Sequence, residues 1–222
     1  YDLWGEMGVQ TDPFPEKLNV PYTSIVWESI NKNGGSSDYV TEIILRDATI
    51  RKGKICYGSR EYGTLFLPDV TSIFPTSLSK LLDFVRTGGR IFCIGKYPEK
   101  SPGFDQYQEK DKEVQSLVEQ LKAFPDRFIL LKKPEDYSFL EWYRMVMTKY
   151  QLPRYMEIEN PDPWLMQVRY QMDDGCEIFF FANTHMHRGH QTRVTFDHAI
   201  TRGRFGWVFD PENGEYHRIS LN

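Results

Sequence analysis

The stretch RIFCIG (90–95) holds the first residue whose type and position suit chemistry, since Cys93 lies between a hydrophobic run and a glycine. Hydrolases with α/β folds keep a nucleophile at such a place, on a strained turn that needs small residues on both sides. Gly95 meets this need, but Ile91 stands two positions before the cysteine. A long loop follows, where the N-terminus of a helix would favour the thiolate. We therefore predict that Cys93 is a core residue.

Three histidines, His185, His187 and His190, lie close together in the stretch THMHRGH. An H-x-H pair on a strand points both rings to one face, but zinc needs a third and a fourth ligand of compatible geometry. We predict a solvated loop between two strands and no metal site. Whether the loop binds another ligand stays open. All five histidines lie from residue 185 onward, so the predicted α/β region that holds Cys93 contains no histidine to act as its base.

Glycoside hydrolysis needs two carboxyl groups about 5 to 10 Å apart, one on each side of the sugar bond. Neighbouring acidic residues occur at Glu109/Asp111/Glu113, at Asp173/Asp174 and at Asp210/Glu212. The first set begins a predicted helix, where carboxylates favour the helix dipole, and the other two lie in predicted hairpin turns. We therefore predict no catalytic residue in this chain.

The composition excludes several classes of partner. The formal net charge is −4 and 26% of the 222 residues are charged, so no broad basic field attracts nucleic acid or anionic lipid. No apolar run approaches the roughly 20 residues that span a bilayer. The three cysteines form no CxxC pair, and we expect them to be reduced. GxGxxG, Walker and HExxH motifs are absent from the sequence, so we expect no cofactor.

From residue 22 to residue 150 the sequence alternates between helical and strand patterns. Helical spacing occurs in 22–35, 76–89, 111–124 and 136–150, and strand patterns in 37–45, 48–58, 62–70, 90–95 and 127–133. The stretch 48–58 is a predicted hairpin around Lys52-Gly53, and 37–45 passes from a strand into a short helical turn. Such alternation predicts an α/β fold with an open, doubly wound, mostly parallel sheet of the flavodoxin or amidotransferase type.

The pattern changes after residue 152. Three prolines without periodicity indicate a linker over 153–163. Two hairpins follow, which turn at Asp174-Gly175 and near Asn213-Gly214, with a further strand between them. We predict a lead-in segment over 1–21, an α/β domain over 22–152 and a partial antiparallel β-sandwich over 164–222.

Open α/β sheets bind ligands beyond the carboxyl ends of their strands. In this sequence the strands of 62–70 and 90–95 end at Asp69 and just before Lys96 and Tyr97, with the loop KYPEKSPG beside them. We predict that any ligand of the α/β domain contacts Asp69, Lys96 and Tyr97.

Four stretches taken in order resemble a known family. They are 36–70, ending in LPDV, 78–103, 174–184 (DGCEIFFFANT) and 206–216 (GWVFDPENGEY). This order resembles the C-terminal half of large bacterial α-L-rhamnosidase-type glycoside hydrolases, family 106 and its relatives. In those enzymes an amidotransferase-like domain and β-sandwich domains follow the catalytic barrel.

The resemblance implies a function outside this chain. It implies that the chain is a non-catalytic part of a periplasmic or extracellular polysaccharide-degrading enzyme, whose barrel precedes Tyr1. The partners would be the rest of the parent chain and a plant or bacterial polysaccharide. Two alternatives stay open. The first is a carbohydrate-binding module with a planar row of exposed aromatic residues such as Trp164, Trp207 or Tyr216. The second is a self-contained hydrolase that uses Cys93 or a carboxylate pair.

Overall fold

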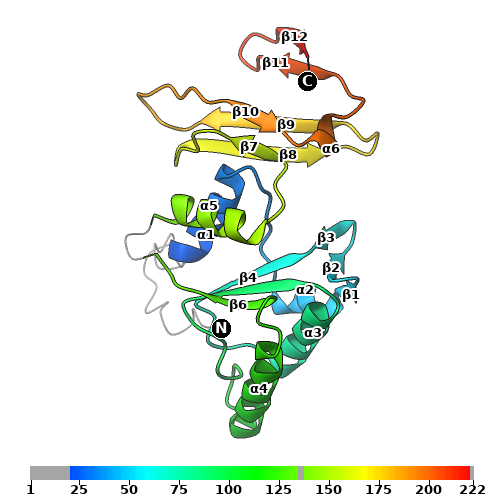
Figure 1. Ribbon diagram of the computed structural model, residues 1–222, viewed down its shortest axis with the longest axis vertical. Coiled ribbons are helices and arrows are strands. Elements are labelled where there is room, and N and C mark those ends of the chain that lie inside the picture. Colours follow the sequence, from blue (N-terminus) through cyan, green and yellow to red (C-terminus); the bar gives the residue numbers. More distant parts are fainter. Residues whose placement is uncertain (1–20, 135–137, 221–222) are drawn as a thin grey trace. The chain divides into compact units, whose positions relative to one another are not determined.

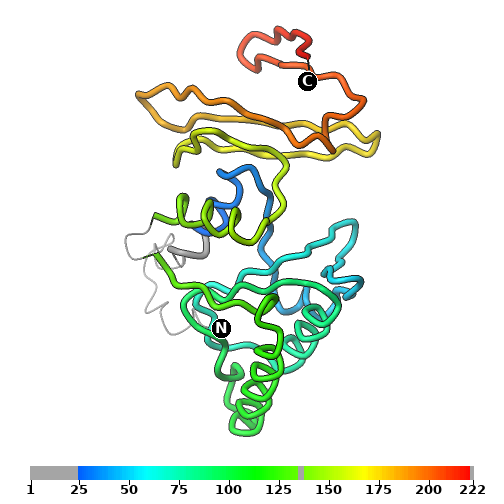
Figure 2. The backbone as a smooth tube through the Cα atoms, in the orientation of Figure 1, coloured from blue at the N-terminus to red at the C-terminus, as the bar shows by residue number. Residues whose placement is uncertain are grey.

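The fold is described from a computed structural model, which describes residues 21–134 and 138–220. The predicted lead-in, 1–21, lies outside this range except for its last residue. The chain divides into two compact units. The described part of unit 1 contains 21–24 and 39–134, and that of unit 2 contains 25–38 together with 138–220. Figures 1 and 2 trace the chain through both units.

Unit 1 combines a small parallel sheet with an antiparallel one. The parallel sheet contains β4 (Thr64–Pro68), β5 (Arg90–Ile94) and β6 (Phe128–Leu131), with α3 (Pro75–Arg86) and α4 (Tyr107–Lys122) as the connecting helices. The antiparallel sheet contains β1 (Thr49–Arg51), β2 (Lys54–Tyr57) and β3 (Arg60–Tyr62), and it follows α2 (Glu42–Asp47). The predicted hairpin at Lys52-Gly53 is confirmed by the pairing of β1 with β2.

The order of the parallel strands is β4-β5-β6, so the chain moves across the sheet in one direction. The two connecting helices share one hydrophobic core with one face of this sheet. A doubly wound sheet reverses direction and carries helices on both faces. The prediction of a mixed α/β fold with parallel strands is confirmed. The doubly wound flavodoxin or amidotransferase arrangement is not confirmed in the described residues.

Helix α3 explains why this core forms. Its apolar residues Leu78, Leu81, Leu82 and Val85 recur at helical spacing, and all four are buried against the sheet. The helix begins at Pro75, and the side chain of its N-cap residue makes no capping hydrogen bond. Instead the carboxylate of Glu42 accepts the backbone N–H of the N-cap residue at 2.8 Å. A tertiary contact therefore satisfies the N–H of the residue that precedes the helix.

The strand predicted at the beginning of 37–45 is absent from the structure. Only α2 forms there, and the hydroxyl of Thr41 accepts the N–H of Ile44 at 3.3 Å. A threonine at this position satisfies one of the free N–H groups of the first turn, which favours the helix over an extended strand.

Unit 2 contains antiparallel strand pairs and three helices. Its helices are α1 (Pro21–Lys32, in this unit from Ile25), α5 (Phe139–Tyr150) and the short α6 (His198–Thr201). Its strands are β7 (Met156–Ile158), β8 (Leu165–Gln171), β9 (Glu177–Asn183), β10 (Val194–Phe196), β11 (Gly206–Phe209) and β12 (Tyr216–Ile219). The pairs are β8–β9, β7–β10 and β11–β12.

Both predicted hairpins are confirmed, and a strand lies inside the predicted linker. Gly175 and Gly214 have positive φ angles of 82° and 76° in the turns. Strand β7 lies within 153–163, where three prolines indicated irregular structure, and it pairs with β10. Met156 and Ile158 of β7 form a small core with Leu165 of β8. The partner strand, which is remote in sequence, therefore decides the structure of this segment.

The end of α1 is fixed to strands that follow it by more than a hundred residues. The side-chain amide of Gln167 donates to the carbonyls of Asn31 (2.7 Å) and Gly35 (2.8 Å). The amide of Asn33 donates to the carbonyl of Leu140 in α5 at 3.1 Å, and Figure 2 shows the two helical segments side by side. These contacts place 25–38 with the C-terminal unit, whereas the sequence pattern placed it in the α/β domain.

Candidate functional site

The carboxyl ends of the parallel strands bring Asp69 and Lys133 together. Asp69 directly follows β4 with a left-handed φ of 50°, and its N–H donates to the carbonyl of Ile94 at 2.9 Å. Its carboxylate accepts from the ammonium of Lys133, which follows β6, at 3.3 Å. Lys133 was not among the predicted residues. The sequence contained a signal for Lys133, because Lys132 and Lys133 directly follow the strand β6 in the same way as Asp69 follows β4.

Gly95 allows this arrangement. It has a φ of 84°, and a Cβ at this position would collide with the Oδ1 of Asp69. Its N–H donates to the carbonyl of Leu131 at 2.9 Å. The glycine thus lets the Asp69 carboxylate lie directly over the end of β5.

The other two predicted residues have different surroundings. The ring of Tyr97 stacks on Phe128 with 4.9 Å between centroids, and the ammonium of Lys122 lies 5.1 Å from its centre. Burial raises the pKa of the Tyr97 hydroxyl. Tyr97 therefore packs against the core beside α4, while Asp69 pairs with Lys133 at the strand ends. Lys96 is half-buried. A ligand contact of these residues stays a prediction.

Cys93 lies in the middle of the parallel sheet. Its side chain is fully buried in the core with α3 and α4, and burial raises its pKa to about 12. A thiol nucleophile needs the opposite shift, toward the thiolate at neutral pH. The geometry therefore agrees with a core residue.

The acidic residues that were candidates for catalysis hold local structure. The carboxylate of Asp111 accepts the N–H of Ser101 at 2.7 Å. That of Asp174 accepts the N–H of Cys176 at 2.9 Å in the β8–β9 turn, and this bond lowers the pKa of Asp174. Asp210 accepts the N–H of Glu212 at 2.9 Å in the β11–β12 turn. A general acid needs a raised pKa, and the bond to Asp174 acts in the other direction.

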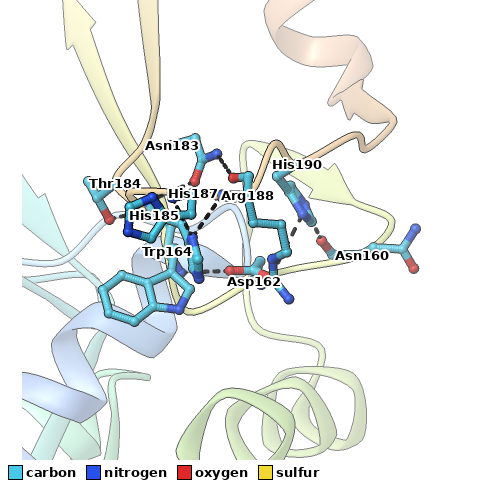
Figure 3. A network of polar contacts seen from close by, with 9 residues as sticks. All are labelled: Asn160, Asp162, Trp164, Asn183, Thr184, His185, His187, Arg188 and His190. Atoms are coloured by element: carbon cyan, nitrogen blue, oxygen red, sulfur yellow. Dashed lines mark hydrogen bonds and ion pairs between the residues drawn. The ribbon is translucent and has the colours of Figure 1, made fainter.

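The three neighbouring histidines lie in a loop that is built around one imidazole (Figure 3). The Nδ1 of His185 accepts two backbone N–H groups, from His187 at 3.1 Å and from Arg188 at 3.0 Å. The imidazole therefore holds this turn by accepting at Nδ1. The side chain of Asn183 bonds to the backbone of His185 and Arg188 on either side.

A second part of the same network surrounds Asp162 (Figure 3). One carboxylate oxygen accepts the N–H of Trp164 at 2.8 Å, and the other pairs with Arg188 at 2.7 Å. The Nδ1 of His190 lies 3.8 Å from that second oxygen, and its Nε2 lies 3.0 Å from the carbonyl of Asn160. Among the residues that the structure describes, no group of three His, Cys, Asp or Glu side chains is placed to hold a metal ion. The contacts join the loop to the beginning of β8.

In the part of the chain that the structure describes, Trp164, Trp207 and Tyr216 do not form the planar row that would identify a flat binding platform. Trp207 and Tyr216 contact each other at 61° between their ring planes. Trp164 lies at the beginning of β8 and meets the ring of His185 at 85°. No helix in the described ranges, 21–134 and 138–220, has the length and apolar character to cross a membrane.

The comparisons with known proteins support part of the family resemblance. The chain is similar to a curated protein of Formosa agariphila named "Putative beta-glucuronidase". The two are 28% identical over 164 residues, which is 73% of this chain and 13% of the relative, so the chain spans a small part of the protein that it matches. No protein-family model and no solved structure matches the chain.

A beta-glucuronidase is by its name a glycoside hydrolase, so the match relates this chain to a region of a glycoside hydrolase. It gives no support to the rhamnosidase family in particular, which stays a prediction from the resemblance.

Proposed function

We propose that this chain is a non-catalytic region of a large polysaccharide-degrading glycoside hydrolase, where it supports the catalytic barrel or the wall of the substrate cleft. The observation that carries the proposal is the match to only 13% of a relative named as a glycoside hydrolase. The remaining length of that relative leaves room for a catalytic domain elsewhere. Within the proposal, the parent enzyme is of the rhamnosidase type and is periplasmic or extracellular.

The state of the candidate groups in unit 1 supports the non-catalytic role. We propose that the α/β unit is an amidotransferase-like domain that has kept its sheet without a nucleophile. Cys93 is buried and protonated, and Gly95 serves the close approach of Asp69 instead of a strained nucleophile turn. The Asp69–Lys133 pair joins the ends of β4 and β6 and so stabilises the sheet edge.

The roles of the acidic residues support the same conclusion. Hydrolysis of a glycoside requires a carboxylic acid with a raised pKa and a second carboxylate across the bond. Asp111, Asp174 and Asp210 each accept a backbone N–H, and each lies in a turn or at the beginning of a helix. For Asp174 the backbone bond from Cys176 lowers the pKa of the carboxyl, which favours the form that cannot deliver a proton.

The test is an assay of the purified 222-residue chain with aryl-rhamnosides, aryl-glucuronides and other aryl-glycosides. We expect no turnover above the buffer control. Turnover that disappears when Glu109, Asp111, Asp174 or Asp210 is changed to its amide would overturn the proposal.

A second test reads the gene upstream of Tyr1. A catalytic barrel in the same reading frame is expected, and a stop codon directly before this segment contradicts the proposal.

A further inference from the structure

One face of the β11–β12 ribbon carries exposed aromatic side chains. Phe209 pairs with Tyr216, and Trp207 pairs with Arg218. Because side chains alternate along a strand and directly paired residues share a face, these four side chains lie on the same side. Trp207 is 52% exposed, Phe209 68% and Tyr216 64%. Contiguous exposed apolar surface of this kind marks a site of interaction.

The rings lie at two different angles. Phe209 and Tyr216 are 5.6 Å apart with 27° between their planes, and Trp207 and Tyr216 are 5.8 Å apart with 61°. Rings at such angles cannot all lie against one flat surface. They can each contact a different ring of a single, twisted sugar chain.

Arg218 supplies a positive charge at one end of this face. Its guanidinium lies 3.9 Å from the ring centre of Phe205, which is 71% exposed. Within the part of the chain that the structure describes, no carboxylate forms an ion pair with Arg218. The nearby Arg204 differs, because it lies 3.9 Å from Glu177.

The acidic residues of the ribbon lie at the opposite end. Asp210, Glu212 and Glu215 are in or beside the turn, and the Asp210 carboxylate is bonded to Glu212 and Asn213. The aromatic face, defined as Phe205, Trp207, Phe209, Tyr216 and Arg218, therefore has a cation at one end and anions beyond the other. A negatively charged ligand is favoured only at the Arg218 end.

We propose that the aromatic face binds a single chain of a uronic-acid-containing polysaccharide. The apolar faces of successive sugar rings contact Trp207 and Tyr216, and a uronate carboxylate pairs with Arg218. Arginine suits this role, because its planar guanidinium bonds a carboxylate with two parallel N–H groups. The choice of an acidic sugar follows from the charge of Arg218, which forms no ion pair with a carboxylate among the described residues. The choice of a carbohydrate as the ligand rests on the proposed function. The choice of a uronic acid agrees with the similarity to a relative named as a beta-glucuronidase.

The test measures binding directly and needs no turnover. The probes are the β-1,4-linked tetramer of glucuronic acid and cellotetraose, its neutral counterpart with the same linkage. Each is titrated into the 222-residue chain while the indole N–H signals of the five tryptophans are followed by NMR. We expect the Trp207 signal to shift and the Trp164 signal to stay. The acidic tetramer should bind at least tenfold more tightly than cellotetraose, with a preference that falls at high salt.

Variants separate the two kinds of contact. Arg218→Gln should remove the preference for the acidic tetramer, and Trp207→Ala should weaken both probes about tenfold, the loss of roughly 1.4 kcal/mol. Trp164→Ala, at another exposed tryptophan, is the matched control and should change neither. Far-UV circular dichroism confirms that each variant is folded.

Three outcomes would overturn the inference: no shift at millimolar probe, equal affinity for both probes, or a binding loss in Trp164→Ala. The first outcome would also favour a protein segment as the occupant of the aromatic face. None of the three contradicts the proposed non-catalytic role, which is tested by turnover alone.

Discussion

At the scale of single residues, two positions of the parallel sheet show how burial and close approach determine chemistry. Cys93 has the position of a nucleophile along the chain, but its side chain points into the core between the sheet and the helices. Asp69 has the position of a ligand-binding residue, and its carboxylate lies over Gly95 and pairs with Lys133. In both cases the neighbours in space determine what the side chain contacts.

The thiol of Cys93 is expected to be unreactive in the folded chain. A bulky disulfide reagent at pH 8 should label it only after unfolding, because the side chain is fully buried. Rapid labelling in the native state that is lost in Cys93→Ala would contradict this.

The same burial predicts a pH dependence of stability. It raises the pKa of the Cys93 thiol from 9.0 to about 12, so between these values the thiol ionises only in the unfolded chain. The contribution of this thiol to the free energy of unfolding is therefore fully present below about pH 9 and is lost as the pH rises toward 12. The free energy of unfolding should fall more steeply in this range for the wild type than for Cys93→Ala.

Gly95→Ala should lower the free energy of unfolding by about 2–4 kcal/mol, through a left-handed backbone and a collision with Asp69. Gly58→Ala is the matched control, since its φ is 58° and an added Cβ meets nothing within 4 Å. It should cost only about 1 kcal/mol. Chemical denaturation measures both. The double variant Asp69→Ala/Gly95→Ala should recover part of the loss, and equal costs at the two glycines would refute the close-approach argument.

At the scale of elements, the end of α1 shows how remote strands fix a helix. The carbonyl of Asn31 in its last turn accepts from Gln167 of β8, and beyond the helix the carbonyl of Gly34 accepts from Tyr155 just before β7 at 2.9 Å. The helix therefore depends on strands that the chain forms more than a hundred residues later.

Gln167→Leu should cost about 1–3 kcal/mol, because it removes the side-chain donor of the buried carbonyl of Gly35 and one of the two donors of the carbonyl of Asn31. Gln171→Leu, on the same strand but exposed, is the control and should stay within about 0.5 kcal/mol of the wild type. Thermal unfolding followed by circular dichroism compares the two. A loss of the same size at both positions would show that the hydrogen bonds to α1 contribute nothing.

At the scale of the whole molecule, the chain leaves apolar strand surface exposed. Val168, Tyr170, Ile178 and Phe180 pair across β8 and β9 and share one face, and each is between 44% and 56% exposed. Unprotected faces and edges of small sheets promote association between chains.

The isolated 222-residue chain is therefore expected to associate at high concentration. Val168→Lys should lower this association, because a charge interrupts the apolar face without a packing loss. Thr195→Lys, at an exposed position of β10, is the control for the added charge. Sedimentation velocity over a hundredfold concentration range is the measurement, and a wild-type chain that stays monomeric throughout would disprove the expectation.

The sequence by itself determined the elements whose signals are local. Helix α3, the buried strands β4 to β6 and the two hairpin turns follow from apolar spacing and from glycines at positive φ, which act within a few residues. It also identified Cys93 as core, since no small residue precedes it. The tertiary structure alone decided the pairing of β7 with β10, the order of the parallel sheet, the attachment of α1 to β8 and the Asp69–Lys133 pair. These depend on contacts between residues far apart in the chain, whose energies no local pattern contains, so only the folded molecule selects among them.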